Sequence, residues 1–146
     1  MNKKLLGAAV LVWTFLLTGC SLDYKLQVAN YTSEPLTVTY RLRENGRFQE
    51  PQAAGLDNSG TGGELKALSA EAYTTDQTKR ERTVKIQPRQ MVILETGPWN
   101  PDSEKGMMQT VEITVEGVNG RVNYSGGKFY QSFNKDDSNI YTIEYR

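Results

Sequence analysis

The chain has 146 residues, with 17 basic and 17 acidic side chains and no histidine. This neutral balance offers no electrostatic footprint for nucleic acid, so nucleic acid is not an expected partner. Without histidine, Ser-His and Cys-His nucleophilic catalysis and the usual zinc sites are excluded.

The N-terminal segment has the pattern of a secretory signal peptide. Lys3 and Lys4 precede an uncharged stretch, Leu5 to Gly19, which is apolar and ends in small residues. A helix needs about 20 residues to cross a bilayer core, and this stretch is shorter. A cleaved leader over residues 1–19 is therefore expected, with a single-span anchor as the alternative. Loss of the leader leaves 15 basic against 17 acidic side chains.

Cys20, the only cysteine, stands directly after this leader. The stretch Leu17-Thr18-Gly19-Cys20 resembles the lipobox of bacterial lipoproteins. The resemblance implies cleavage between Gly19 and Cys20 and lipid attachment to the Cys20 thiol. The lipid would be a diacylglyceryl group, often with a third chain such as palmitate on the new amino terminus. Two or more acyl chains hold a protein durably on a membrane.

The resemblance also implies a location in the cell envelope. In lipoproteins of diderm bacteria, aspartate after the cysteine tends to retain the protein at the inner membrane, whereas serine, here Ser21, permits transfer outward. We therefore expect an outer-membrane protein that faces the periplasm, with display on the cell surface as the alternative. Residues 20–23 would be the lipidated N-terminus and tether, and residues 24–146 one domain.

Apolar and polar residues alternate with period two along most of this domain, which is typical of half-buried strands. Turn residues separate the alternating segments; one such turn, 31–35, contains Pro35. The alternation predicts about eight short strands and an antiparallel β-sandwich, immunoglobulin-like in architecture, with a small β-barrel as the alternative. The expected strands are 24–28, 36–42, 84–86, 91–94, 111–115, 122–124, 129–133 and 140–145.

One expected hairpin comes with a specific register. Asn119-Gly120 is the preferred pair for a two-residue type I′ turn, in which both central residues have positive φ. The prediction therefore places Val115 opposite Tyr124, with both side chains on the apolar face.

Two long connections interrupt the strands. Residues 44–82 show no strand periodicity, contain a glycine-rich stretch at 57–63 and include at most one or two helical turns around Leu65, Leu68 and Ala72. Connections of this length are usually functional or disordered. The basic run 79–82 within it is interpreted as a solvated approach to a strand.

The second connection, residues 97–109, contains the candidate partner contacts Trp99, Met107 and Met108. Tryptophan is enriched at interface hot spots, and methionine adapts to varied partners. The alternative is that these side chains plug the open end of the sandwich.

Three function classes remain open. The favoured one is a non-enzymatic binding or assembly module on a lipid anchor, with an envelope protein or a glycan as partner; it should expose an apolar patch near Trp99 or on residues 44–82. A carbohydrate-acting enzyme should instead show two carboxylates across a groove. A structural spacer should show neither feature. No cofactor or metal is expected, because the polar stretch 134–139 lacks the spacing of a calcium loop and fits a turn.

Overall fold

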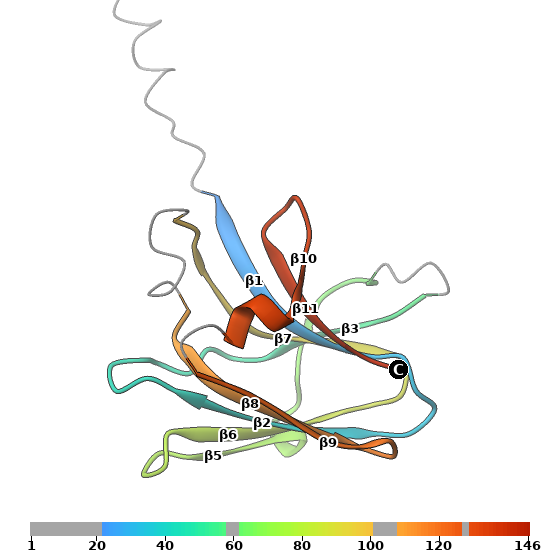
Figure 1. The fold of residues 1–146 in the computed structure, drawn as a ribbon. Coiled ribbons are helices and arrows are strands. Elements are labelled where there is room, and N and C mark those ends of the chain that lie inside the picture. The colour runs from blue at the N-terminus through green and yellow to red at the C-terminus, as the bar shows by residue number, and fades with distance from the viewer. Residues whose placement is uncertain (1–21, 58–61, 101–107, 127–128) are drawn as a thin grey trace, which may run out of the picture.

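The computed structural model describes residues 22–57, 62–100, 108–126 and 129–146. Two β-sheets pack face to face and do not close into a barrel (Figure 1), which confirms the predicted all-β sandwich. The strands are β1 (Asp23–Asn30), β2 (Leu36–Leu42), β3 (Gln52–Gly55), β4 (Lys66–Ala67), β5 (Tyr73–Asp76), β6 (Glu81–Ile86), β7 (Gln90–Pro98), β8 (Thr110–Gly117), β9 (Gly120–Ser125), β10 (Asn134–Lys135) and β11 (Ile140–Tyr145).

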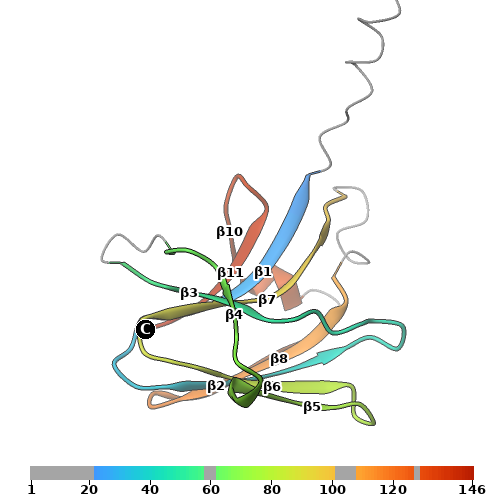
Figure 2. The same ribbon diagram turned by 180° about the vertical axis from the view of Figure 1, so that it is seen from behind.

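The six-stranded sheet has the order β10-β11-β1-β7-β3-β4, and the five-stranded sheet has the order β5-β6-β2-β8-β9. The pairing of β1 with β11 is parallel, whereas the other described pairings are antiparallel. The first and last strands of the domain thus lie side by side (Figure 2).

The inward side chains of both sheets form one hydrophobic core, as the alternation predicted. In β1, for example, Tyr24, Leu26 and Val28 are almost completely buried while Lys25 and Gln27 between them are partly exposed. At the far end of β1, the Asn30 side chain is buried and donates to the backbone carbonyls of Glu34 at 2.8 Å and Gln87 at 3.1 Å. Asn30 therefore stabilises two connections that cross from one sheet to the other, the one from β1 to β2 and the one from β6 to β7.

The β8–β9 hairpin has a different register from the predicted one. Val115 pairs with Val122, and Tyr124 pairs with Ile113. The turn residues are Val118 and Asn119; Gly120, with φ of 110°, follows them. Asn119 is not among the described non-glycine residues with positive φ, so the type I′ prediction was wrong. Because the shift is two residues, the faces are preserved.

The expected strand 129–133 is also wrong. Residues Phe129–Ser132 form the 3-10 helix η3, and Phe129, Tyr130 and Phe133 are buried. Their spacing fits a helical turn, whereas a strand would bury alternate residues. The Phe133 ring packs edge-on against Tyr124 of β9 with ring centroids 5.5 Å apart, so η3 covers this side of the core.

The segment 44–82 contains β3, β4, β5 and the short 3-10 helix η1 (Ala70–Ala72). The basic run 79–82 is only partly solvated: Lys79 is exposed as predicted, whereas Arg80 and Arg82 have structural contacts. Arg82 is 8% exposed, and its guanidinium lies between the rings of Phe48 and Tyr73, 4.5 and 4.8 Å from their centroids. Arg80 donates to the carbonyl of Gly46 at 2.6 Å. These arginines therefore fix the segment against the five-stranded sheet.

Candidate functional site

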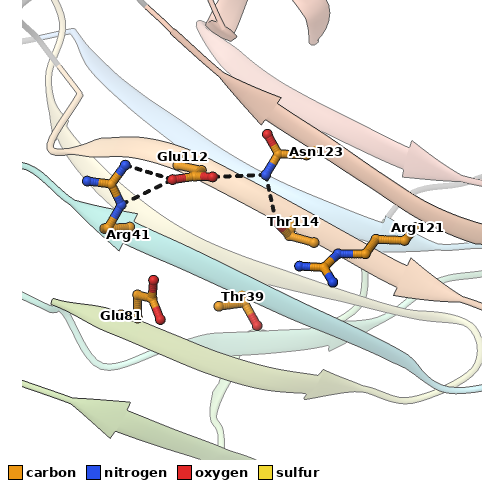
Figure 3. Close-up of a pocket in the computed structure, with 7 residues that line it drawn as sticks. All are labelled: Thr39, Arg41, Glu81, Glu112, Thr114, Arg121 and Asn123. Carbon is orange, nitrogen blue, oxygen red and sulfur yellow. Dashed lines mark hydrogen bonds and ion pairs between the residues drawn. The ribbon is translucent and has the colours of Figure 1, made fainter. Parts of the chain in front are cut away.

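A polar groove lies on the outer face of the five-stranded sheet (Figure 3). It has a volume of about 180 Å³ and crosses four neighbouring strands, β6, β2, β8 and β9. We call it the sheet groove; its lining residues are Thr39, Arg41, Glu81, Glu112, Thr114, Arg121 and Asn123.

Strand pairing explains how these residues meet. Arg41 is directly opposite Glu112, and Thr114 is directly opposite Asn123. All four project away from the core because they alternate with buried residues such as Ile113. The sequence patterns predicted outward-facing polar residues on β2 and β8. They did not predict the sheet groove, because it depends on the order of the four strands in the sheet.

Glu112 is the centre of the hydrogen-bond network in the sheet groove. Arg41 donates to its Oε2 through Nη2 at 2.7 Å and Nε at 3.1 Å, and Asn123 donates to its Oε1 at 3.0 Å (Figure 3). The hydrogen bond from Asn123, followed by the one from Arg41, lowers the pKa of the Glu112 carboxyl. Glu112 is thus held as an oriented carboxylate.

Two further charges complete the sheet groove. The guanidinium of Arg121 reaches from β9 toward Thr114, while the carboxylate of Glu81 stands on the β6 side (Figure 3). The surface therefore presents two cations, two carboxylates and neutral hydroxyl and amide groups within one shallow depression. Such a set can form hydrogen bonds and ion pairs with a polar partner.

A second polar cluster, which the sequence did not reveal, lies inside the sandwich. Glu95 is 3% exposed, and both its carboxylate oxygens accept hydrogen bonds. Oε1 accepts from the Tyr24 hydroxyl and, at 2.6 Å, from the backbone N–H of Gln109. Oε2 accepts from the backbone N–H of Thr110 at 2.8 Å and from its hydroxyl at 2.7 Å. One carboxylate therefore joins β1 and β7 of one sheet to β8 of the other.

Two β-bulges aim these groups inward. Leu26 pairs with Glu95 and Gln27 pairs with Ile93, which leaves Leu94 as the extra residue in β7. Leu94 and Glu95 are consecutive, yet both are buried. A second bulge, at Val111 of β8, accompanies the inward placement of Thr110. Regular alternation would have put Glu95 on the outer face, and bulges are known to redirect side chains in this way.

Alkaline pH should weaken the fold through this cluster. Burial, reinforced by the nearby negative charge of Glu95, raises the pKa of the Tyr24 hydroxyl well above the ordinary value of 10.0. Burial also raises the pKa of Tyr40. Above about pH 10 the unfolded chain loses protons that the folded chain keeps, so the free energy of unfolding falls as pH rises.

The free energy of unfolding should fall by up to about 1.4 kcal/mol per pH unit for each tyrosine whose pKa is raised by folding. Urea unfolding measures this decline at a series of values from about pH 9 to 11, which bracket the ordinary tyrosine pKa. The variant Tyr24→Phe is expected to be less stable at neutral pH but to show a shallower alkaline decline. An equally steep decline in Tyr24→Phe would show that Tyr24 is not responsible.

The three candidate partner contacts, Trp99, Met107 and Met108, differ in whether a partner could reach them. Trp99 is partly buried and packs against the core, with Lys135 Nζ 5.1 Å from its ring centroid. Met108 is 4% exposed and belongs to the core, so it is not available to a partner in this conformation. Met107 lies outside the described residues, as do Gly19 and Cys20 with the predicted cleavage and lipidation site.

The surface of the described residues does not show the expected apolar patch around Trp99. Among the large exposed hydrophobic residues, Leu22 lies beside Trp99, Leu65 lies in the segment 44–82, and Val118 and Val122 belong to the β8–β9 hairpin, so none of these places gathers more than two of them. Of the predicted polar turn 134–139, Asn134 and Lys135 form β10, and the rest is the turn to β11, in which Asp136 Oδ1 accepts from the backbone N–H groups of Ser138 and Ile140, both at 2.9 Å. Among the described residues, no cluster of three or more acidic or cysteine side chains is placed to hold a metal ion.

Within the described ranges, no helix has the length and apolar character required to cross a membrane. The comparisons with known proteins add no relative: no family model matches the chain, and neither a curated protein nor a solved structure matches it.

Proposed function

We propose that this chain is a lipid-anchored envelope protein whose β-sandwich binds another envelope component through the sheet groove. The anchor rests on the lipobox-like stretch that ends at Cys20. The location that this implies is the outer membrane, with the domain in the periplasm. The binding role rests on one observation above all, the oriented set of polar groups around Glu112 on the outer face of the five-stranded sheet.

The dimensions of the sheet groove favour a macromolecular partner. Its volume of about 180 Å³ is below the roughly 300–1,000 Å³ of pockets that enclose small ligands. A shallow polar depression instead suits hydrogen bonding to one stretch of an extended partner, such as a protein segment or a glycan chain. The opposite charges of Arg121 and Glu81 would then fix the orientation of the partner.

A catalytic role is the second candidate, because the sheet groove does contain two carboxylates, Glu81 and Glu112. Glycoside hydrolysis needs a carboxylic acid whose pKa is raised, so that it can donate a proton. The pKa of Glu112 is lowered, and two donors already occupy its oxygens. This arrangement supports recognition better than proton transfer.

A photo-crosslinking amino acid at position 121 tests the proposed binding surface in the acylated protein within its own envelope. Arg121 is exposed, and Figure 3 marks no hydrogen bond or ion pair between it and the other residues of the sheet groove, so the replacement should be tolerated. We expect a discrete crosslinked adduct after irradiation. The matched control places the same group at Lys66, an exposed residue of β4 on the other sheet.

A second variant, Arg41→Ala, tests whether partner binding can be weakened without a loss of stability. Exposed ion pairs contribute at most about 1 kcal/mol, so Arg41→Ala should unfold at nearly the same urea concentration as the wild type. It should nevertheless weaken the adduct at position 121, because Glu112 loses a partner that orients it. Equal crosslinking at positions 121 and 66, or no effect of Arg41→Ala, would contradict binding through the sheet groove.

A further inference from the structure

Few residues separate the proposed anchor from the folded domain. Strand β1 begins at Asp23, and Leu22 is already fixed, since its carbonyl accepts from the backbone N–H of Trp99 at 2.7 Å. Cys20 and Leu22 are two residues apart, and two extended residues span at most about 7 Å. A lipid on Cys20 would therefore hold one end of the sandwich close to the bilayer surface.

Strand pairing identifies the groups at that end. Asp23 pairs with Pro98, so the end of β7 lies beside the start of β1. Lys25 donates from its backbone N–H to the carbonyl of Asn139 at 3.2 Å, so the β10–β11 turn also lies there (Figures 1 and 2). We call this surface the β1 end; it comprises Leu22, Trp99, Lys135 and the turn 136–139.

The composition of the β1 end suits the headgroup layer of a bilayer. Leu22 is 55% exposed although it is apolar, and Trp99 lies next to it with Lys135 over its ring. Lysine covers apolar surface with its stem and keeps its charged head at the membrane–water interface, whereas the indole N–H of Trp99 is buried, so Trp99 contributes apolar ring surface only. The two acidic groups Asp136 and Asp137 outweigh the single charge of Lys135, so attraction to anionic lipid does not contribute to this contact.

We infer that the β1 end rests on the headgroup layer of the membrane that holds the lipid anchor, with the β8–β9 turn directed away from it. This inference rests on the proposed anchor at Cys20. The opposite end is well separated: Tyr145 pairs with Asn30 at the end of β1, and its hydroxyl accepts from the backbone N–H of Asn119 in the β8–β9 turn. The eight residues of β1 span about 23 Å at the usual rise per residue.

Energy transfer from two matched dye positions tests this orientation. Asp137→Cys places a thiol in the β10–β11 turn, and Val118→Cys places one in the β8–β9 turn, where Val118 is 66% exposed. In the acylated protein the Cys20 sulfur is a thioether, so the introduced thiol is the only one. Each variant is labelled with a donor dye and reconstituted in phosphatidylethanolamine–phosphatidylglycerol vesicles with an acceptor on the headgroups.

The donor at position 137 should transfer severalfold more efficiently than the donor at position 118, and added salt should not remove the difference. Equal transfer, or stronger transfer from position 118, would overturn the orientation while leaving the anchor intact. The same preparations are sedimented with their vesicles and their masses are measured. A protein that does not sediment, or that carries an unmodified Cys20, would overturn the anchor and the orientation with it.

Discussion

Replacing Glu95 with alanine is expected to lower the free energy of unfolding by about 3–5 kcal/mol, because it removes one side of a buried charged network. The variant would leave the Tyr24 hydroxyl, the Thr110 hydroxyl and the backbone N–H groups of Gln109 and Thr110 without their present acceptor. It would also open a cavity between the two sheets.

Urea unfolding measures this loss, and a change of that size should move the midpoint by roughly 2 M. Glu95→Gln should be intermediate, because the amide keeps the shape of the side chain but presents an N–H₂ group to donors. Glu116→Ala, which changes an exposed glutamate on β8, is the matched control and should stay within about 0.5 kcal/mol of the wild type. A loss below about 1 kcal/mol in Glu95→Ala would show that the carboxylate does not hold the sheets together.

Replacing Cys20 with serine is expected to remove essentially all of the protein from the membrane fraction or to leave the precursor uncleaved. The physical reason is that each buried methylene contributes about 0.8 kcal/mol to membrane binding, and this variant could carry no thioether-linked chain. Fractionation followed by detection of the protein measures the outcome.

Ser21→Asp is the matched control for Cys20→Ser, because it changes the neighbouring residue and keeps the thiol. By the resemblance to lipoproteins, it should stay membrane-bound but move toward the inner membrane. Unchanged membrane association and processing in Cys20→Ser would count decisively against acylation.

The sequence predicted the parts of the fold that local alternation controls. Exposure alternates along the whole of β2 and β11 and along β1 as far as Val28, and the structure buries the expected members, such as Tyr141 and Ile143. Alternation does not say which strands pair. The parallel pairing of β1 with β11 joins the two ends of the domain, so it depends on long-range packing.

The errors also have physical causes. In the β8–β9 hairpin, Asn119-Gly120 fits a type I′ turn, but it also fits a turn in which Gly120 follows the two central residues, and local sequence does not separate these. The hydroxyl of Tyr145 binds both the N–H of Asn119 and, at 3.1 Å, the carbonyl of Gly120. That contact comes from another strand, so only the folded chain contains it.

The two polar clusters differed in how far the sequence revealed them. Glu112 and Arg41 were recognisable as outward-facing residues, but their meeting in the sheet groove depends on the pairing of β2 with β8. The sequence did not predict that Glu95 is buried, because the bulge at Leu94 turns its side chain from the outer face to the core. The short strands β3, β4 and β5 were missed since pairing partners, rather than their own periodicity, define them.

The proposed anchor would hold the domain close to a membrane, and the sheet groove would then offer a polar face to a partner. The proposed location, the orientation and the class of partner all depend on the lipid at Cys20.

Intact-mass spectrometry of the protein isolated from its own membrane tests that dependence most directly. We expect a chain that begins at Cys20 and carries a diacylglyceryl group on its sulfur. A chain that retains residues 1–19, or a processed chain with a free Cys20 thiol, would contradict it.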